Sequence, residues 1–301
     1  MRNFTFKGLF LAIVYIVLGS LSIQAADGLI TKQITIKLEK AGTLPNKIGS
    51  TKKFQITNLK IIGEINGTDL QMIREMAGKD ARGNDTDGML SVLDLSDAKI
   101  VEGKGYYMGN SYSTSNDKIG DLAFEGCSGL TSLTRPSGLT EIGVGAFEAC
   151  SGLTSITLPS GVTKIGYCAF EGCSGLTSLT LPSGVTEIGY SAFEGCSGLT
   201  SIYVYTEKLP DMGRDVFDGC DAKKCTVYVP KGTYDDYWLS EFGYFENIVE
   251  FDPTGINNVI TSNDAKELSR YSLNGQRLSS PAKGLNIVKY SDGSVKKVAI
   301  Q

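Results

Sequence analysis

The middle of the chain repeats itself every 23 residues. Residues 142–164 read IGVGAFEACSGLTSITLPSGVTK, and residues 165–187 read IGYCAFEGCSGLTSLTLPSGVTE. The same pattern begins one unit earlier at Ile119 and one unit later at Ile188. A fixed period of this length is typical of a solenoid, in which each coil contacts only its neighbours and like residues stack in columns. We therefore expect an extended, open surface and no enclosed pocket.

Each unit divides into three pieces. In residues 153–158 the apolar side chains follow an LxxLxL pattern, which predicts a strand of a concave sheet, and the Pro-Ser-Gly that follows ends it. Residues 162–166 form a second, short extended run, and residues 169–173 form a tight turn whose Phe and Cys point inward. The pattern predicts a mainly β fold, a right-handed leucine-rich-repeat solenoid, with its array of coils over residues 119–230.

The first segment, residues 1–25, has the features of a secretory signal peptide. Arg2 and Lys7 precede an apolar run that ends in small residues at Ala25 and Ala26. This run is too short for a stable membrane span, and no later stretch reaches about 18 consecutive apolar residues. We expect a secreted or surface-displayed protein, on the exterior of the outer membrane, with no transmembrane segment once the signal is removed.

Residues 26–118 are expected to form an N-terminal cap. Between its two less regular strands, residues 69–77 show helical spacing, with Thr68 or Asp69 as the N-cap. The helix should cover the open end of the solenoid. The two strands with the LxxLxL pattern are expected at 56–61 and 90–95.

Beyond the array, residues 231–252 are expected to cap the other end of the core, as solenoids require for solubility. The residues expected to supply the apolar bulk are Trp238, Phe242, Tyr244, Phe245 and Ile248. Residues 253–301 carry seven Lys or Arg against three Asp or Glu and read as a linker followed by a small β unit. Its strands are expected at 268–273, 285–290 and 295–300.

The chain contains no histidine, which excludes Ser-His-Asp catalysis and imidazole zinc sites. We predict no enzyme and no metal or cofactor. The net charge of −4 at pH 7, without a basic patch interleaved with aromatics, argues against nucleic acid. Residues 85–88 match the middle of a calcium loop, but Gly83 stands where the first carboxylate is needed. Glutamates that recur in the turns are interpreted as solvated charges: Glu125, Glu148, Glu171 and Glu194.

Two columns of like residues are expected inside the array. Buried, reduced cysteines are expected at Cys127, Cys150, Cys173, Cys196 and Cys220. Stacked aromatic rings are expected at Phe124, Phe147, Phe170, Phe193 and Phe217. Parallel Cβ vectors in such a column do not suit disulfides, so the pair Cys220 and Cys225 is the more plausible bridge.

The candidate binding face is the outward side of the concave strands. It offers small hydroxyl side chains that end in tyrosines, and tyrosine suits protein or glycan ligands because its ring is amphipathic. The candidate residues are Asp94, Thr134, Ser155, Thr157, Ser178, Thr180, Tyr203, Tyr205 and Tyr228. The alternative is that Ser and Thr recur here only because they favour solvated strand surfaces.

A second candidate contact lies in an inserted loop, residues 101–117. This loop carries Tyr106, Tyr107 and Tyr112 where a loop is normally small and polar. The tyrosines either contact a ligand or fold back over the first repeats.

The pattern Ile-Gly-x-x-Ala-Phe-Glu-x-Cys-Ser-Gly-Leu-Thr-Ser-Ile/Leu-Thr-Leu-Pro, from 119 to 204, closely resembles the BspA-type leucine-rich repeat of bacterial surface proteins. Residues 56–96 and 227–232 are similar to the entry and exit segments of such proteins in Bacteroidetes. The segment 271–277, with 284–288 and 297–300, is similar to the short C-terminal sorting tail of the type IX export system.

This resemblance implies an exported or surface-displayed adhesin that recognises host or neighbouring-cell proteins and carries no catalytic residues. It also implies that the C-terminal tail contacts the export machinery. The alternative function is glycan capture in association with polysaccharide uptake, for which aromatic platforms would be needed.

Overall fold

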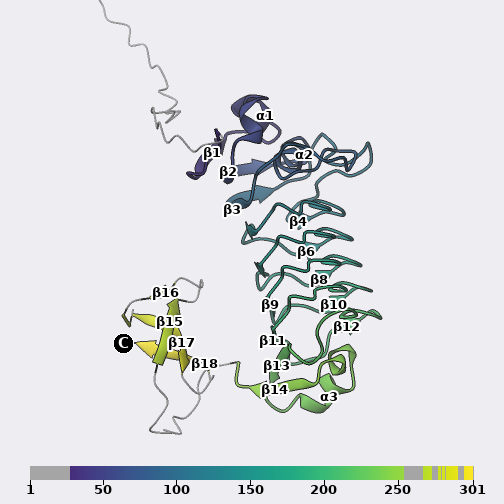
Figure 1. The fold of residues 1–301 in the computed structure, drawn as a ribbon, viewed down its shortest axis with the longest axis vertical. Helices are drawn as coiled ribbons and strands as arrows, with labels where there is room; N and C mark the ends of the chain where they lie inside the picture. Colours follow the sequence, from purple (N-terminus) through teal and green to yellow (C-terminus); the bar gives the residue numbers. More distant parts are fainter. Residues whose placement is uncertain are drawn as a thin grey trace, which may run out of the picture.

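The computed structural model describes residues 28–253, 267–272, 277–278, 280–281, 283–290 and 295–300. The predicted signal peptide lies outside these residues. Within them, one large sheet of nine strands runs along the molecule, and its strand order follows the chain order (Figure 1). Its strands are β1 Ile34–Leu38, β2 Asn58–Ile65, β3 Val92–Ile100, β5 Ser132–Thr134, β7 Ser155–Thr157, β9 Ser178–Leu181, β11 Ser201–Val204, β13 Thr226–Pro230 and β14 Asn247–Phe251.

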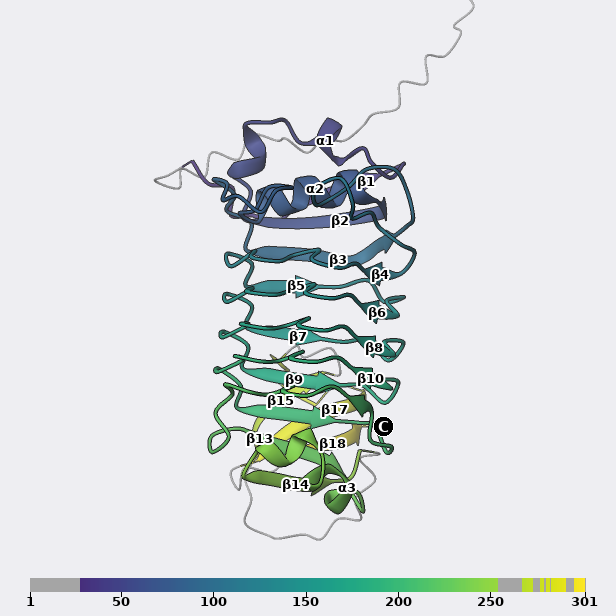
Figure 2. The same ribbon diagram turned by 90° about the vertical axis from the view of Figure 1, so that its right-hand side faces the viewer.

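A second sheet of five short strands stacks along the other side of the coils. Its strands are β4 Lys118–Ile119, β6 Glu141–Ile142, β8 Lys164–Ile165, β10 Glu187–Ile188 and β12 Asp211–Met212. All neighbouring strands in both sheets are parallel. Figure 2 shows each coil of the array contributing one long and one short strand to the stack. The predicted β solenoid is therefore confirmed.

The two predicted interior columns are confirmed. The five phenylalanines stack with ring centroids between 5.1 and 5.8 Å apart and interplanar angles of 3 to 11°. In the cysteine column, the thiols of Cys150, Cys173, Cys196 and Cys220 each donate to a backbone carbonyl of the preceding coil, as Cys173 Sγ does to Phe147 O at 3.1 Å. All seven cysteines lie in the described residues and are free thiols, so no Cys220–Cys225 bridge forms.

Glycine permits the coils to approach this closely. A Cβ on Gly166 would lie 2.6 Å from the carbonyl carbon of Gly143 in the preceding coil, closer than any real Cβ contact. The Ile-Gly pair that opens each unit is thus required by the spacing of the stack.

The N-terminal cap contains α1 Leu44–Lys47, η1 Lys52–Phe54 and α2 Gly67–Met76. The expected N-cap was wrong: Asn66 caps α2, because its Oδ1 accepts from Thr68 N at 3.1 Å. Asp69 completes a capping box and, being fully buried, also accepts from Leu44 N at 2.8 Å. One carboxylate therefore ties α1 to α2.

The C-terminal cap contains α3 Tyr234–Trp238 and η2 Glu241–Tyr244. The expectation that Trp238 and Tyr244 plug the core is wrong, because they are 47% and 41% exposed. The expectation is confirmed for Phe242 and Phe245, which are fully buried, and Ile248 packs partly buried against the core. Tyr237, which the sequence did not single out, is also fully buried and joins them. The Tyr237 hydroxyl donates to Thr206 O at 2.7 Å, and this hydrogen bond holds the ring of Tyr237 in the core.

The C-terminal unit is an antiparallel sheet in the order β16-β15-β17-β18. Its strands are β15 Glu267–Ser272, β16 Arg277–Leu278, β17 Gly284–Tyr290 and β18 Val295–Ile300. Three of them lie where strands were predicted. In the described part of the chain, no helix has the length and apolar character needed to cross a bilayer.

Candidate functional site

The structure brings the predicted concave residues into two adjacent rows on one face of the nine-stranded sheet. The strand register pairs Asp94 with Thr134, and Tyr203 with both Thr180 and Tyr228. Inward neighbours such as Leu179 are fully buried. The side chains of Thr134, Ser155 and Thr157 are exposed, and those of Ser178, Thr180, Tyr203, Tyr205 and Tyr228 are partly buried. Their role in binding stays a prediction.

The N-terminal end of this face is charged but internally neutralised. Lys60 Nζ lies 3.0 Å from Asp94 Oδ2 and 2.8 Å from Asp97 Oδ2. Burial works against ionisation of Asp94, yet hydrogen bonds from Ser96 and Lys60 hold the pKa of that carboxyl below its ordinary value. Asp94 is therefore already engaged within the sheet and is a weaker candidate for ligand contact than the sequence suggested.

An arginine interrupts the middle of the face. Arg135 stands where the next two coils have Leu158 and Leu181, and its Nε donates to Thr157 O at 2.6 Å. The pairing between β5 and β7 is reduced to one residue pair, whereas three pairs join β7 and β9. Burial lowers the pKa of the Arg135 guanidinium. The change from TLPSG to TRPSG was visible in the sequence but was not singled out.

The C-terminal end of the face is an aromatic cluster, which we define as Tyr203, Tyr205, Tyr228 and Phe251. The rings of Tyr203 and Tyr228 stack with centroids 4.6 Å apart and an interplanar angle of 6°. Phe251 meets Tyr205 edge-on, at 5.3 Å and 86°. Burial raises the pKa of the Tyr203 and Tyr205 hydroxyls, so they stay protonated donors at neutral pH. Phe251 was missed because β14 is not a copy of the repeat.

The inserted loop does not present its three tyrosines together. Tyr107 is 1% exposed, and its hydroxyl donates to Asp121 O at 2.8 Å, so the hypothesis of a ligand contact is wrong for this residue. Tyr112 is partly buried against it, with ring centroids 6.3 Å apart. Tyr106 is 49% exposed and stays a candidate. The loop thus folds back over the first repeat.

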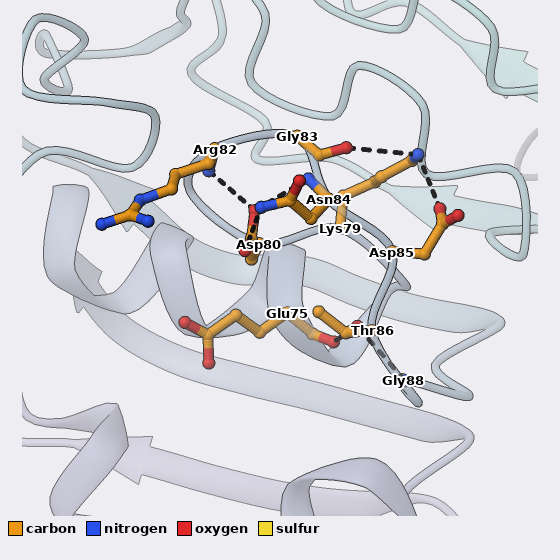
Figure 3. A network of polar contacts seen from close by, with 9 residues as sticks. All are labelled: Glu75, Lys79, Asp80, Arg82, Gly83, Asn84, Asp85, Thr86 and Gly88. Carbon is orange, nitrogen blue, oxygen red and sulfur yellow. Dashed lines mark hydrogen bonds and ion pairs between the residues drawn. The ribbon is translucent and has the colours of Figure 1, made fainter.

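In the segment that resembled a calcium loop, Asp85 pairs with a lysine, and the turn just before it is stabilised by its own amides (Figure 3). Asp80 accepts from the backbone N–H groups of Arg82 and Asn84, each at 2.8 Å. Asp85 Oδ1 bonds Lys79 Nζ at 2.7 Å. The carboxylates point to different partners, and among the described residues no group of three or more acidic, Cys or His side chains converges.

Comparison with known proteins agrees with this geometry. Residues 111–234 match the family described as BspA type leucine rich repeat region, in six copies. The repeat sequence and the stacked parallel sheets together define a leucine-rich-repeat solenoid, whose residues 111–234 match the BspA type of repeat. A search of curated proteins gives no match.

Three solved structures are similar. A leucine rich repeat protein of T. pallidum is 24% identical with a TM-score of 0.38, over 48% of this chain and 67% of that one. A leucine-rich repeat protein from Bacteroides ovatus is 22% identical with a TM-score of 0.34, over 73% and 66%. A leucine rich cell surface protein from Faecalibacterium prausnitzii is 20% identical with a TM-score of 0.25, over 65% and 51%. The chain thus spans only about half of the third protein's length.

Proposed function

We propose that the protein is an adhesin, exported or displayed on the cell surface, which recognises host or neighbouring-cell proteins through its concave sheet. The observation that supports this most is the composition of that face. From β7 onward, beyond Arg135, small hydroxyl side chains on β7 and β9 lead to the aromatic cluster at the C-terminal end of the face. Partly buried tyrosines, with an apolar ring and a hydroxyl donor, are typical of anchor residues in protein interfaces.

The ring geometry favours a protein ligand over a glycan. A sugar platform needs a free aromatic face, but Tyr203 and Tyr228 cover one face of each other at 4.6 Å. The edge of Phe251 also meets Tyr203, at 6.4 Å and 87°. The Tyr203 and Tyr228 rings thus each have one face covered, and their hydroxyl groups supply hydrogen-bond donors. Glycan capture therefore stays the alternative and is tested by the same experiment.

The test is binding of the purified protein to arrays of extracellular proteins and of polysaccharides. The double variant Tyr203→Ala, Tyr228→Ala should weaken binding to the protein ligand by about tenfold or more, as loss of an interface anchor does. The matched control is Tyr234→Ala, Trp238→Ala, which removes two exposed, stacked rings of α3, outside the concave sheet. Unchanged binding by the first variant removes the assignment of the face, and retention on polysaccharides alone supports the glycan function.

Export and display are tested separately. We propose that residues 1–25 direct export and that the tail within 253–301 contacts the export machinery. Cells that produce the full chain should carry it on the outer surface, whereas cells that produce a chain without residues 265–301 should release or retain it. Equal surface display of both chains would contradict a sorting role for the tail.

A further inference from the structure

Two exposed tyrosines occupy equivalent positions in adjacent coils, outside the concave sheet. Tyr167 and Tyr190 are 48% and 51% exposed, and their ring centroids lie 5.3 Å apart. Val144, 42% exposed, holds the same position one coil earlier. The backbone links the three coils in series, because Gly145 N donates to Tyr167 O at 2.8 Å and Cys168 N to Tyr190 O at 2.9 Å. We call Val144, Tyr167 and Tyr190 the aromatic ridge.

A column of carboxylates runs beside this ridge. We define the carboxylate column as Glu125, Glu148, Glu171 and Glu194, one residue from each coil. Neighbouring coils bond directly at this position, since Ala149 N donates to Glu171 O at 2.7 Å. Burial, and then the charges of Glu171 and Glu125, raise the pKa of Glu148. The Glu148 carboxylate is thus close enough to those of Glu125 and Glu171 to be repelled by them.

The aromatic ridge and the carboxylate column lie on the same turn of each coil, since each ridge residue precedes a column residue by four positions. Cys168 follows Tyr167 in the chain, and its thiol hydrogen-bonds the Glu171 carboxylate. One coil earlier, Gly145 follows Val144, and the position of a Cβ on Gly145 lies 3.0 Å from Glu148 Oε2. A ligand that covers the rings therefore also meets the carboxylates.

In the column on the short strands next to the ridge, charged residues pair with each other from coil to coil. Lys118, Glu141, Lys164 and Glu187 alternate in sign on the short strands. They form ion pairs between coils: Lys118 with Glu141, and Lys164 Nζ with Glu187 Oε1 at 2.6 Å. In the described part of the chain, by contrast, no ion pair joins the carboxylate column to a Lys or Arg. Like charges stacked in register are destabilising.

We propose that the aromatic ridge and the carboxylate column form a docking surface for a basic, Lys- and Arg-rich segment of a protein partner. Ammonium and guanidinium groups bind tyrosine faces and pair with carboxylates, so such a segment complements both features at once. A divalent ion fits less well, because no three such side chains converge among the described residues. Exposed Arg214, which follows Tyr190 in the ridge position, ends the surface on its C-terminal side. The proposal is independent of the concave face.

The experiment titrates the full-length protein with a fluorescent oligolysine peptide and with an oligoglutamate peptide of equal length. Oligolysine should bind saturably and weaken with added salt, because exposed charges are screened. Two variants probe the surface: Glu148→Gln, Glu171→Gln removes charge without changing size, and Tyr167→Ser, Tyr190→Ser removes the rings. Each should weaken binding by about fivefold or more.

The matched control is Asp235→Asn, Asp236→Asn, which changes the net charge equally at exposed positions of α3. It should bind oligolysine as the parent does. The thermal midpoint of the Glu148→Gln, Glu171→Gln variant should stay equal or rise, since repulsion is relieved; this separates lost binding from lost folding. Absence of saturable oligolysine binding, an equal loss in the control, or full binding by both surface variants would overturn the proposal.

Discussion

Within the array, the interior columns and the outer columns follow different rules. Every coil supplies the same phenylalanine to the interior, and each ring lies almost parallel to the next. At the ridge position the successive coils supply Asp121, Val144, Tyr167, Tyr190 and Arg214. The interior is uniform because a stack tolerates only one shape, while the outer positions vary because all five side chains are exposed. Recognition can therefore change without altering the scaffold.

The largest expected effect on stability distinguishes an interior aromatic residue, Phe170, from an outer one of the same coil, Tyr167. Phe170→Ala should lower the free energy of unfolding by about 4 kcal/mol, because the ring is fully buried between two others and leaves a cavity. Tyr167→Ala, three residues earlier and 48% exposed, should change it by less than about 0.5 kcal/mol. Urea unfolding of both variants checks this. Similar losses for the two would break the distinction.

A smaller difference is expected at the cysteines. Cys173→Ser should cost about 1 to 2 kcal/mol, because a hydroxyl in an apolar niche gains only the bond to Phe147 O. Cys168→Ser, at a partly exposed position, should be close to neutral. The comparison uses chemical denaturation, and a neutral Cys173→Ser variant would contradict the importance of this column.

One outer position should be improved by substitution. Ala149 has φ of 56°, whereas the equivalent residues Gly126, Gly172 and Gly195 have φ of 69 to 71°. Ala149→Gly should raise stability by about 0.5 to 1 kcal/mol, because the left-handed strain exceeds the entropy cost of glycine. Ala146→Gly, at a buried position of the same coil, should instead lower the thermal midpoint. A loss in both variants would mean that the strain at Ala149 is negligible.

The smallest expected effect concerns the chemical reactivity of the Cys168 thiol and not the stability of the fold. Burial, followed by the hydrogen bond to Glu171, raises the pKa of the Cys168 thiol to about 12 from 9.0. The group thus holds its proton through neutral pH, and its reaction with iodoacetamide should be about a thousandfold slower than that of a free cysteine, rising as the pH approaches 12. Rapid labelling of Cys168 at neutral pH would show that the thiol is not held against Glu171.

What the sequence predicted well is what it repeats. The Phe and Cys columns and the row from Thr134 to Tyr203 follow from the period, because residues one period apart overlie one another. The burial of Tyr107 could not be predicted in this way, since its loop occurs once and its partner, Asp121 O, is a backbone atom. Adjacent Tyr237 and Trp238 are equally apolar, so only the observed helix orientation distinguishes the core ring from the exposed one.

Arg74 illustrates the same limit in the N-terminal cap. It is fully buried, and Nη1 donates to Leu122 O at 2.5 Å, while Nε and Nη2 have no hydrogen-bond partner in the described part of the chain. Helical periodicity placed this position on α2 but favours a charged residue at the surface. Its burial depends on how the cap meets the first coil, which no local pattern encodes.

Because Lys118, Glu141, Lys164 and Glu187 alternate in sign, the charge pairing depends on whether the number of coils is odd or even. A chain shortened by the single coil 142–164 would keep its strand register but place Glu141 beside Glu187, so that like charges meet. Loss of the two coils 142–187 would instead leave Lys118 paired with Glu141, as it is now. The solenoid should therefore tolerate the loss or gain of an even number of coils more readily than that of an odd number.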